Sequence, residues 1–78
     1  MAKSLEEITQ LVKEIVEESA DVEVTSTSEH LASLGIDSLD KVVILQNVED
    51  TFEIDIDIDE EDGLVSVDTI ASLVLLKQ

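Results

Sequence analysis

Apolar residues recur at helical spacing at both ends of the chain, and each of these stretches follows a residue suited to capping a helix. Ser4 and Glu7 have the spacing of a capping box, and the apolar steps of three and four that follow predict a helix over about residues 4–18. Ser66 is a good N-cap for a last helix. The predicted buried positions are Leu5, Ile8, Leu11, Val12, Ile15 and Val16 in the first helix, and Val67, Ile70, Ala71, Leu73, Val74 and Leu76 in the last.

A central helix is predicted to begin at Asp37 or Ser38. Its apolar set is too wide for one stripe, because at about 100° per residue it wraps well over half of the helix. Either this helix is buried on two sides, or some of its apolar residues contact a partner. The set comprises Leu39, Val42, Val43, Ile44, Leu45, Val48 and Phe52.

Two connections separate these helices. Residues 19–36 form a long loop whose scattered apolar residues predict packing along the helices, and a loop of this length tends to be functional. Residues 52–59 alternate apolar and acidic side chains as a strand does, but no partner strand is evident. An extended loop leading into a short helix at about 59–64 is therefore preferred.

The expected fold is all-α: one domain over residues 1–78, a small bundle of three main helices plus one short helix, with a long first loop.

The charge balance narrows the classes of partner. Twenty acidic residues face four lysines and no arginine, for a net charge of −16, yet 44% of the chain is apolar and can form a core. Nucleic acid and anionic membranes are poor partners for such a surface, whereas a basic protein surface is its complement. We expect a monomer without membrane insertion.

The chain has no cysteine, and its N-terminus lacks the apolar region of a signal peptide, so a cytoplasmic location is expected.

Enzymatic and metal-binding readings find little support. A serine hydrolase elbow needs glycines flanking the serine, which Ser38 lacks, although a pairing of Ser38 with His30 stays open. Asp55, Asp57 and Asp59 have the step that opens a calcium loop, but the required glycine is missing in either register. No dedicated metal site is predicted, and loose binding of divalent cations is expected from charge density alone.

Ser38 stands at a helix start, just after the turn expected at Gly35. If Asp37 caps the helix, the Ser38 hydroxyl is free and a phosphate ester there would lie near unpaired N–H groups. If Ser38 is itself the cap, it has no further role. Helix-end geometry alone favours the second reading.

The segment Leu34–Asp40 resembles the phosphopantetheine-attachment motif of acyl carrier proteins, and the order of helices resembles that family over the whole chain. The resemblance implies that Ser38 receives 4′-phosphopantetheine from coenzyme A, through a separate magnesium-dependent phosphopantetheinyl transferase. It implies that Asp37 and Asp40 dock that transferase and that Leu39 is an apolar contact for partner enzymes. It also implies acidic partner contacts at Glu49 and Asp50.

The function implied is that of a carrier and not an enzyme: the thiol of the arm would hold acyl groups as thioesters in fatty-acid or related biosynthesis, serving synthases with basic surfaces. The alternative is an acidic protein-binding or cation-binding module with an unmodified serine. An acyl pocket is expected between the central and last helices, lined by Val42, Leu45, Val48, Ile56, Leu64 and Ala71.

Some positions depart from the family's usual pattern without touching the attachment motif. Val43 replaces an acidic contact, Lys41 adds a positive charge to the same helix, and the remaining departures are His30, Ser33 and Asp57. These differences suggest a specialised carrier.

Salt or divalent cations should raise the melting temperature, because clustered carboxylates repel one another. Nine of the fourteen residues from Glu49 to Asp62 are acidic, so this segment should respond most to salt. Thermal unfolding across a salt series measures the effect, and a melting temperature indifferent to salt would contradict it.

Overall fold

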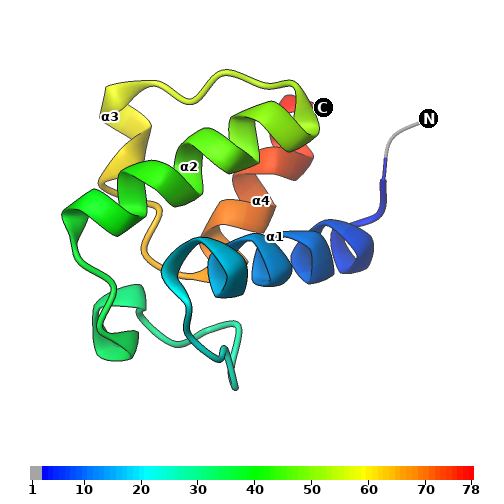
Figure 1. Ribbon diagram of the computed structural model, residues 1–78. Helices are drawn as coiled ribbons and strands as arrows, with labels where there is room; N and C mark the ends of the chain where they lie inside the picture. The colour runs from blue at the N-terminus through cyan, green and yellow to red at the C-terminus, as the bar shows by residue number, and fades with distance from the viewer. Residues whose placement is uncertain (1–2) are drawn as a thin grey trace.

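The computed structural model describes residues 3–78, so Met1 and Ala2 of the predicted domain lie outside the described residues. Within that range the chain is helical and has no strand, which confirms the predicted all-α bundle (Figure 1). The elements, in order, are α1 (Leu5–Ala20), the 3-10 helix η1 (Leu31–Leu34), α2 (Ser38–Phe52), α3 (Ile58–Glu61) and α4 (Val67–Lys77).

The predicted caps start the first and last helices. The Ser4 hydroxyl accepts a hydrogen bond from the Glu7 N–H at 3.2 Å, and the Ser66 hydroxyl accepts one from the Thr69 N–H at 3.2 Å. Each bond satisfies a donor that a helix cannot satisfy within its own first turn. The first helix runs two residues past its predicted end, to Ala20.

The core lies where α1 packs against both α2 and α4. It is aliphatic throughout, and Phe52 lies half-buried at its edge. Burial of these side chains is the main favourable term available to a chain of this size, and it must outweigh the repulsion among the carboxylates. The fully buried large side chains are Ile8, Val12, Val16, Ile44, Val48, Val67, Ile70 and Val74.

The long first loop packs onto the bundle, as its apolar residues predicted. Val24 and Leu31 are buried, and the Leu31 N–H donates to the Val65 carbonyl at 2.8 Å. The Asp68 N–H donates to the Thr27 carbonyl at 3.0 Å, which ties the loop to the start of α4. The 3-10 helix η1, which no pattern in the sequence predicted, shapes the end of this loop next to α2 (Figure 1).

The end of α1 is held by the side chain of its own last turn. Asp21 has a left-handed backbone, with φ of 53°, and carries the chain out of the helix. The Glu17 carboxylate then accepts the Val24 N–H at 2.9 Å, seven residues ahead. Since left-handed conformations are disfavoured for residues other than glycine, this bond helps to hold the turn.

The end of α2 repeats this arrangement. Glu53 is left-handed, with φ of 56°, and the Glu49 carboxylate accepts the Ile56 N–H at 2.8 Å. The two segments, residues 17–24 and 49–56, share a pattern of Glu, a left-handed acidic residue four later, and alternating apolar residues after it. The segment 52–59, with its apparent strand pattern, thus runs from the last residue of α2 through a loop into α3, which confirms the predicted loop that leads into a short helix.

The short helix α3 begins one residue earlier than predicted and ends at Glu61, not at 64. The reason is a reciprocal cap: Asp57 is the N-cap, and the Glu60 carboxylate accepts the Asp57 N–H at 3.0 Å. This pairing selects Ile58 as the first helical residue.

Replacing Glu17 by alanine should lower the free energy of unfolding by about 1–2 kcal/mol, because it leaves the Val24 N–H without its charged acceptor. Chemical denaturation of the variant measures the loss. The matched control is Glu18→Ala, an exposed neighbour that makes no such bond, and equal losses in both variants would contradict the assignment.

Candidate functional site

Ser38 is the first residue of α2 and is exposed. Two features place it there. Gly35 closes η1 in a left-handed conformation, with φ of 83°, that other residues rarely adopt. Ile36 then buries its side chain in the core and anchors the turn, so that the chain enters α2 with Ser38 at the surface.

Asp37, and not Ser38, caps the helix. Its carboxylate accepts the Asp40 N–H at 2.9 Å, and its carbonyl accepts the Lys41 N–H at 3.0 Å. Within residues 3–78 the Ser38 hydroxyl makes no hydrogen bond. Of the two possible caps that the sequence offered, Asp37 is the cap. Ser38, the next residue, keeps its hydroxyl free.

This geometry fits a phosphate ester on Ser38. The ester would lie beside the N–H groups of the first turn of a fifteen-residue helix, at the positive end of its dipole. Because the hydroxyl is exposed, an attached arm would leave the surface without displacing packed side chains.

A hollow of about 220 Å³ opens beside Ser38. Lys41 and His30 line it together with mostly apolar residues: Leu31, Ala32, Ile36, Leu64 and Val65. His30 is exposed, and its Nδ1 accepts the Ala32 N–H at 3.2 Å. Although His30 and Ser38 border the same hollow, no hydrogen bond joins them in the described part of the chain.

The predicted partner-contact residues follow α2 along its length. Asp37 and Asp50 are exposed, Leu39 is 76% exposed, and Asp40 is half-buried. Glu49 is also half-buried, and one of its carboxylate oxygens is occupied by the Ile56 N–H. Its role within the fold was missed because the bond spans seven residues and depends on the path of the loop.

The wide apolar set of α2 divides into two faces. Ile44, Leu45 and Val48 are buried, whereas Val42 and Val43 are 45% and 44% exposed and lie on the same helix as exposed Leu39. The bundle therefore leaves part of the set uncovered, and contact of these residues with a partner stays a prediction. Ile58 of α3 is also 81% exposed, which its place in the alternating segment did not reveal.

A second hollow, of about 140 Å³, lies between α2 and α3. It is lined by Val42, Leu45, Gln46, Glu49, Ile56 and Glu61. Three of the predicted pocket residues, Val42, Leu45 and Ile56, are among these. Leu64 instead lines the hollow beside Ser38, and Val48 and Ala71 are packed within the core.

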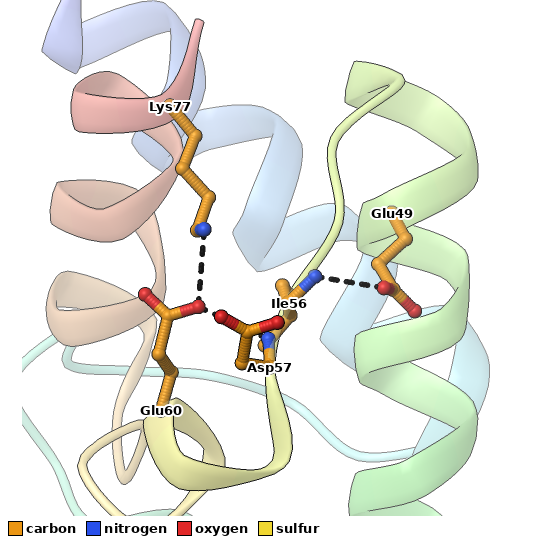
Figure 2. Close-up of polar contacts among 5 residues, drawn as sticks. All are labelled: Glu49, Ile56, Asp57, Glu60 and Lys77. Atoms are coloured by element: carbon orange, nitrogen blue, oxygen red, sulfur yellow. Dashed lines mark hydrogen bonds and ion pairs between the residues drawn. The ribbon is translucent and has the colours of Figure 1, made fainter.

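The helix α3 is joined to α4 by an ion pair between Glu60 and Lys77, with 3.0 Å between the oxygen and nitrogen atoms (Figure 2). The Asp57 N–H, and after it the Lys77 ammonium, lower the pKa of Glu60 below its ordinary value of 4.5. Figure 2 shows this pair between α3 and α4, and the Glu49 bond between α2 and the loop that leads into α3.

No group of three or more histidine, aspartate or glutamate side chains within residues 3–78 is arranged to hold a metal ion. In the same range, no helix combines the length and apolar character needed to cross a membrane.

Residues 6–74 match the family model described as the phosphopantetheine attachment site. The chain belongs to this family, as its resemblance to acyl carrier proteins implied, and the cofactor of the family is covalently attached 4′-phosphopantetheine. Its members are carriers rather than catalysts.

A relative is the chloroplastic acyl carrier protein 1 of Spinacia oleracea, which is 35% identical over 72 residues. The match covers 92% of this chain and 51% of the relative, so the chain spans about half of that relative's length.

Glu60 should make stability depend on pH in acid. A carboxyl whose pKa is lowered by folding stabilises the folded state above its unfolded pKa, near 4.5, and loses this effect as pH falls through the folded value. Wild type should therefore exceed Glu60→Gln in stability at neutral pH, and the difference should shrink below pH 4.5.

Urea unfolding at a series of pH values measures that difference. Asp59→Asn is the control, because it makes the same charge change on α3 at an exposed residue without these contacts. A difference for Glu60→Gln that stays constant across the acid range would contradict the prediction.

Proposed function

We propose that this chain carries acyl groups as thioesters on a 4′-phosphopantetheine arm attached to the Ser38 hydroxyl. The observation that carries the proposal is that two neighbouring residues take the two roles at the start of α2. Asp37 caps the helix, and Ser38 is left exposed with an uncommitted hydroxyl at the positive end of the helix dipole.

Loading is a phosphoryl-type transfer in which coenzyme A is the donor. The Ser38 oxygen forms a bond to the phosphorus that bears pantetheine, the bond from that phosphorus to the nucleotide portion breaks, and the hydroxyl proton passes to the transferase. The product is a phosphodiester with one negative charge, which the first-turn N–H groups of α2 stabilise. The terminal thiol then exchanges acyl groups, so the arm carries the chemistry and the protein supplies its position.

The docking surface for the transferase and for the synthases is the exposed face of α2. The carboxylates of Asp37, Asp40 and Asp50 complement basic side chains, and they also accelerate encounter in a protein of net charge −16. The apolar contacts between them are Leu39, Val42 and Val43, with Ile58 added from α3. Glu49 contributes through the carboxylate oxygen that the Ile56 N–H leaves free.

The pathway is fatty-acid or related biosynthesis, in which this chain serves as a specialised carrier. Val43 presents an apolar side chain, 44% exposed, where the family commonly has an acidic contact. A partner optimised for a carboxylate at that point would lose one charge pair with this chain.

Loading of Ser38 tests the proposal. The protein is incubated with coenzyme A, magnesium and a phosphopantetheinyl transferase, and its intact mass is measured. We expect a gain of one phosphopantetheine in wild type and none in Ser38→Ala.

The matched control is Ser33→Ala, which removes another exposed hydroxyl five residues away and should load as wild type does. No mass gain with several active transferases, or a gain that persists in Ser38→Ala, would overturn the proposal.

A further inference from the structure

The hollow beside Ser38 has walls from three separate parts of the chain. They are η1 with the residue before it, the first turn of α2, and the connection that leads into α4. The Leu31 N–H donates to the Val65 carbonyl at 2.8 Å, and the Ile36 N–H donates to the Leu31 carbonyl at 3.3 Å. Because these bonds already join the walls, a ligand that enters the hollow does not have to order them.

Two side chains that can carry positive charge border this hollow, in a chain that has four lysines and one histidine. Lys41 follows Ser38 by three residues, so the two side chains lie on the same face of α2. His30 borders the hollow from the residue before η1. The one carboxylate among the lining residues, that of Asp37, is engaged by the Asp40 N–H.

The hollow between α2 and α3 has the opposite charge. Glu49 and Glu61 border it, and no lysine is among its lining residues. Glu18 and Asp50 likewise border a hollow between α1 and α2, again without a lysine. Of these three hollows, the one beside Ser38 is therefore the best suited to receive an anion.

Both cationic side chains are held in place and still have hydrogen-bond donors left. An ammonium group has three N–H donors, and within residues 3–78 that of Lys41 gives one to the Glu61 carbonyl at 2.7 Å. His30 Nδ1 accepts the Ala32 N–H at 3.2 Å, so the proton of the neutral imidazole lies on Nε2. The remaining donors of Lys41 and His30 are available to a ligand.

The floor of the hollow is apolar, because buried Leu31, Ile36 and Leu64 line it. In 4′-phosphopantetheine, one methylene joins the phosphate to a carbon that bears two methyl groups. A phosphodiester on Ser38 thus brings an anion and a branched alkyl group together, a few bonds apart. The hollow offers donors for the anion and an apolar surface for the methyl groups, which is the usual composition of a ligand site.

We propose that the hollow beside Ser38 is a docking site for the first part of the phosphopantetheine arm. Lys41 and His30 donate hydrogen bonds to the phosphodiester, and the dimethyl group lies against the apolar floor. This inference rests on the proposed function. The rest of the arm extends from this anchor, so Lys41 and His30 are positioning residues that limit the directions in which the thiol is presented.

The test uses the loaded protein, with carbon-13 in the two pantetheine methyl groups. Nuclear Overhauser contacts are measured between these methyl groups and those of Leu64, and phosphorus-31 relaxation reports how freely the phosphodiester moves. In wild type we expect the contacts to be present and the phosphorus to tumble with the protein.

In Lys41→Met the contacts should weaken at least about threefold and the phosphorus should move more freely, because a charge-assisted hydrogen bond is lost. Lys41→Arg keeps a charged donor and should keep the contacts. His30→Asn should also weaken them, since asparagine can still cap η1 but has no imidazole. Lys13→Met makes the same charge change on α1 and should match wild type.

A second pair of variants adds charge and leaves Lys41 and its Glu61 contact untouched. Ala32 and Ser33 are neighbours in η1 and both are exposed, but only Ala32 lines the hollow. Ala32→Asp should release the arm, because the new carboxylate repels the phosphodiester, and Ser33→Asp should have a smaller effect. This pair tests the site even where Lys41→Met loosens the bundle.

The outcomes separate the docking site from the carrier function. A loaded wild-type protein whose pantetheine methyl groups contact no residue of the hollow would overturn the docking site alone. Equal weakening in Lys41→Met and Lys13→Met, or in Ala32→Asp and Ser33→Asp, would also overturn it. Failure of Ser38 to load at all would overturn the proposed function, and the docking site with it.

Discussion

The hydrogen bond from the Asp40 N–H to the Asp37 carboxylate decides where α2 begins, and the rest of the site depends on that start. Serine caps helices about as well as aspartate does. Without the Asp37 carboxylate, the Ser38 hydroxyl would be the obvious replacement, and it would then turn inward to bind a backbone N–H. One side chain cannot both cap the helix and carry the arm. In this chain Asp37 is the cap and Ser38 is the attachment point, and Ile36, on the other side of Asp37, is buried and holds the turn.

The acidic residues do more than form a surface for basic partners. Glu17, Glu49 and Glu60 each accept a backbone N–H, so carboxylates shape the ends of α1 and α2 and the start of α3. The cost is an excess of negative charge, which the aliphatic core and a few lysines must offset. Two of those lysines contact α3, which has no buried residue. Packing therefore does little there to offset the repulsion among the carboxylates.

The sequence predicted those parts of the structure that depend on interactions between residues close together in the chain. The apolar stripes of α1 and α4 and the caps Ser4 and Ser66 depend on residues three or four apart, so the helices and their starts could be predicted. The choice between Asp37 and Ser38 as cap could not, because both residue types suit the position. The attachment motif itself became informative only through its resemblance to a family.

The unpredicted features are contacts whose geometry depends on the path of a loop. The Glu49 bond spans seven residues and the Lys41 bond twenty, and no periodic pattern marks either one. The sequence did show that the apolar set of α2 was too wide for one buried stripe. It could not show which members stay exposed, because that depends on how α1 and the rest of the bundle pack around α2.

The position of the arm is the central claim, and fragment-ion mass spectrometry of the loaded wild-type protein tests it most directly. The chain has eight serines, and fragmentation on both sides of each one locates the added mass. The division of cap and tether between Asp37 and Ser38 predicts that all of the phosphopantetheine lies on Ser38. Phosphopantetheine on any other serine, or spread over several, would contradict it.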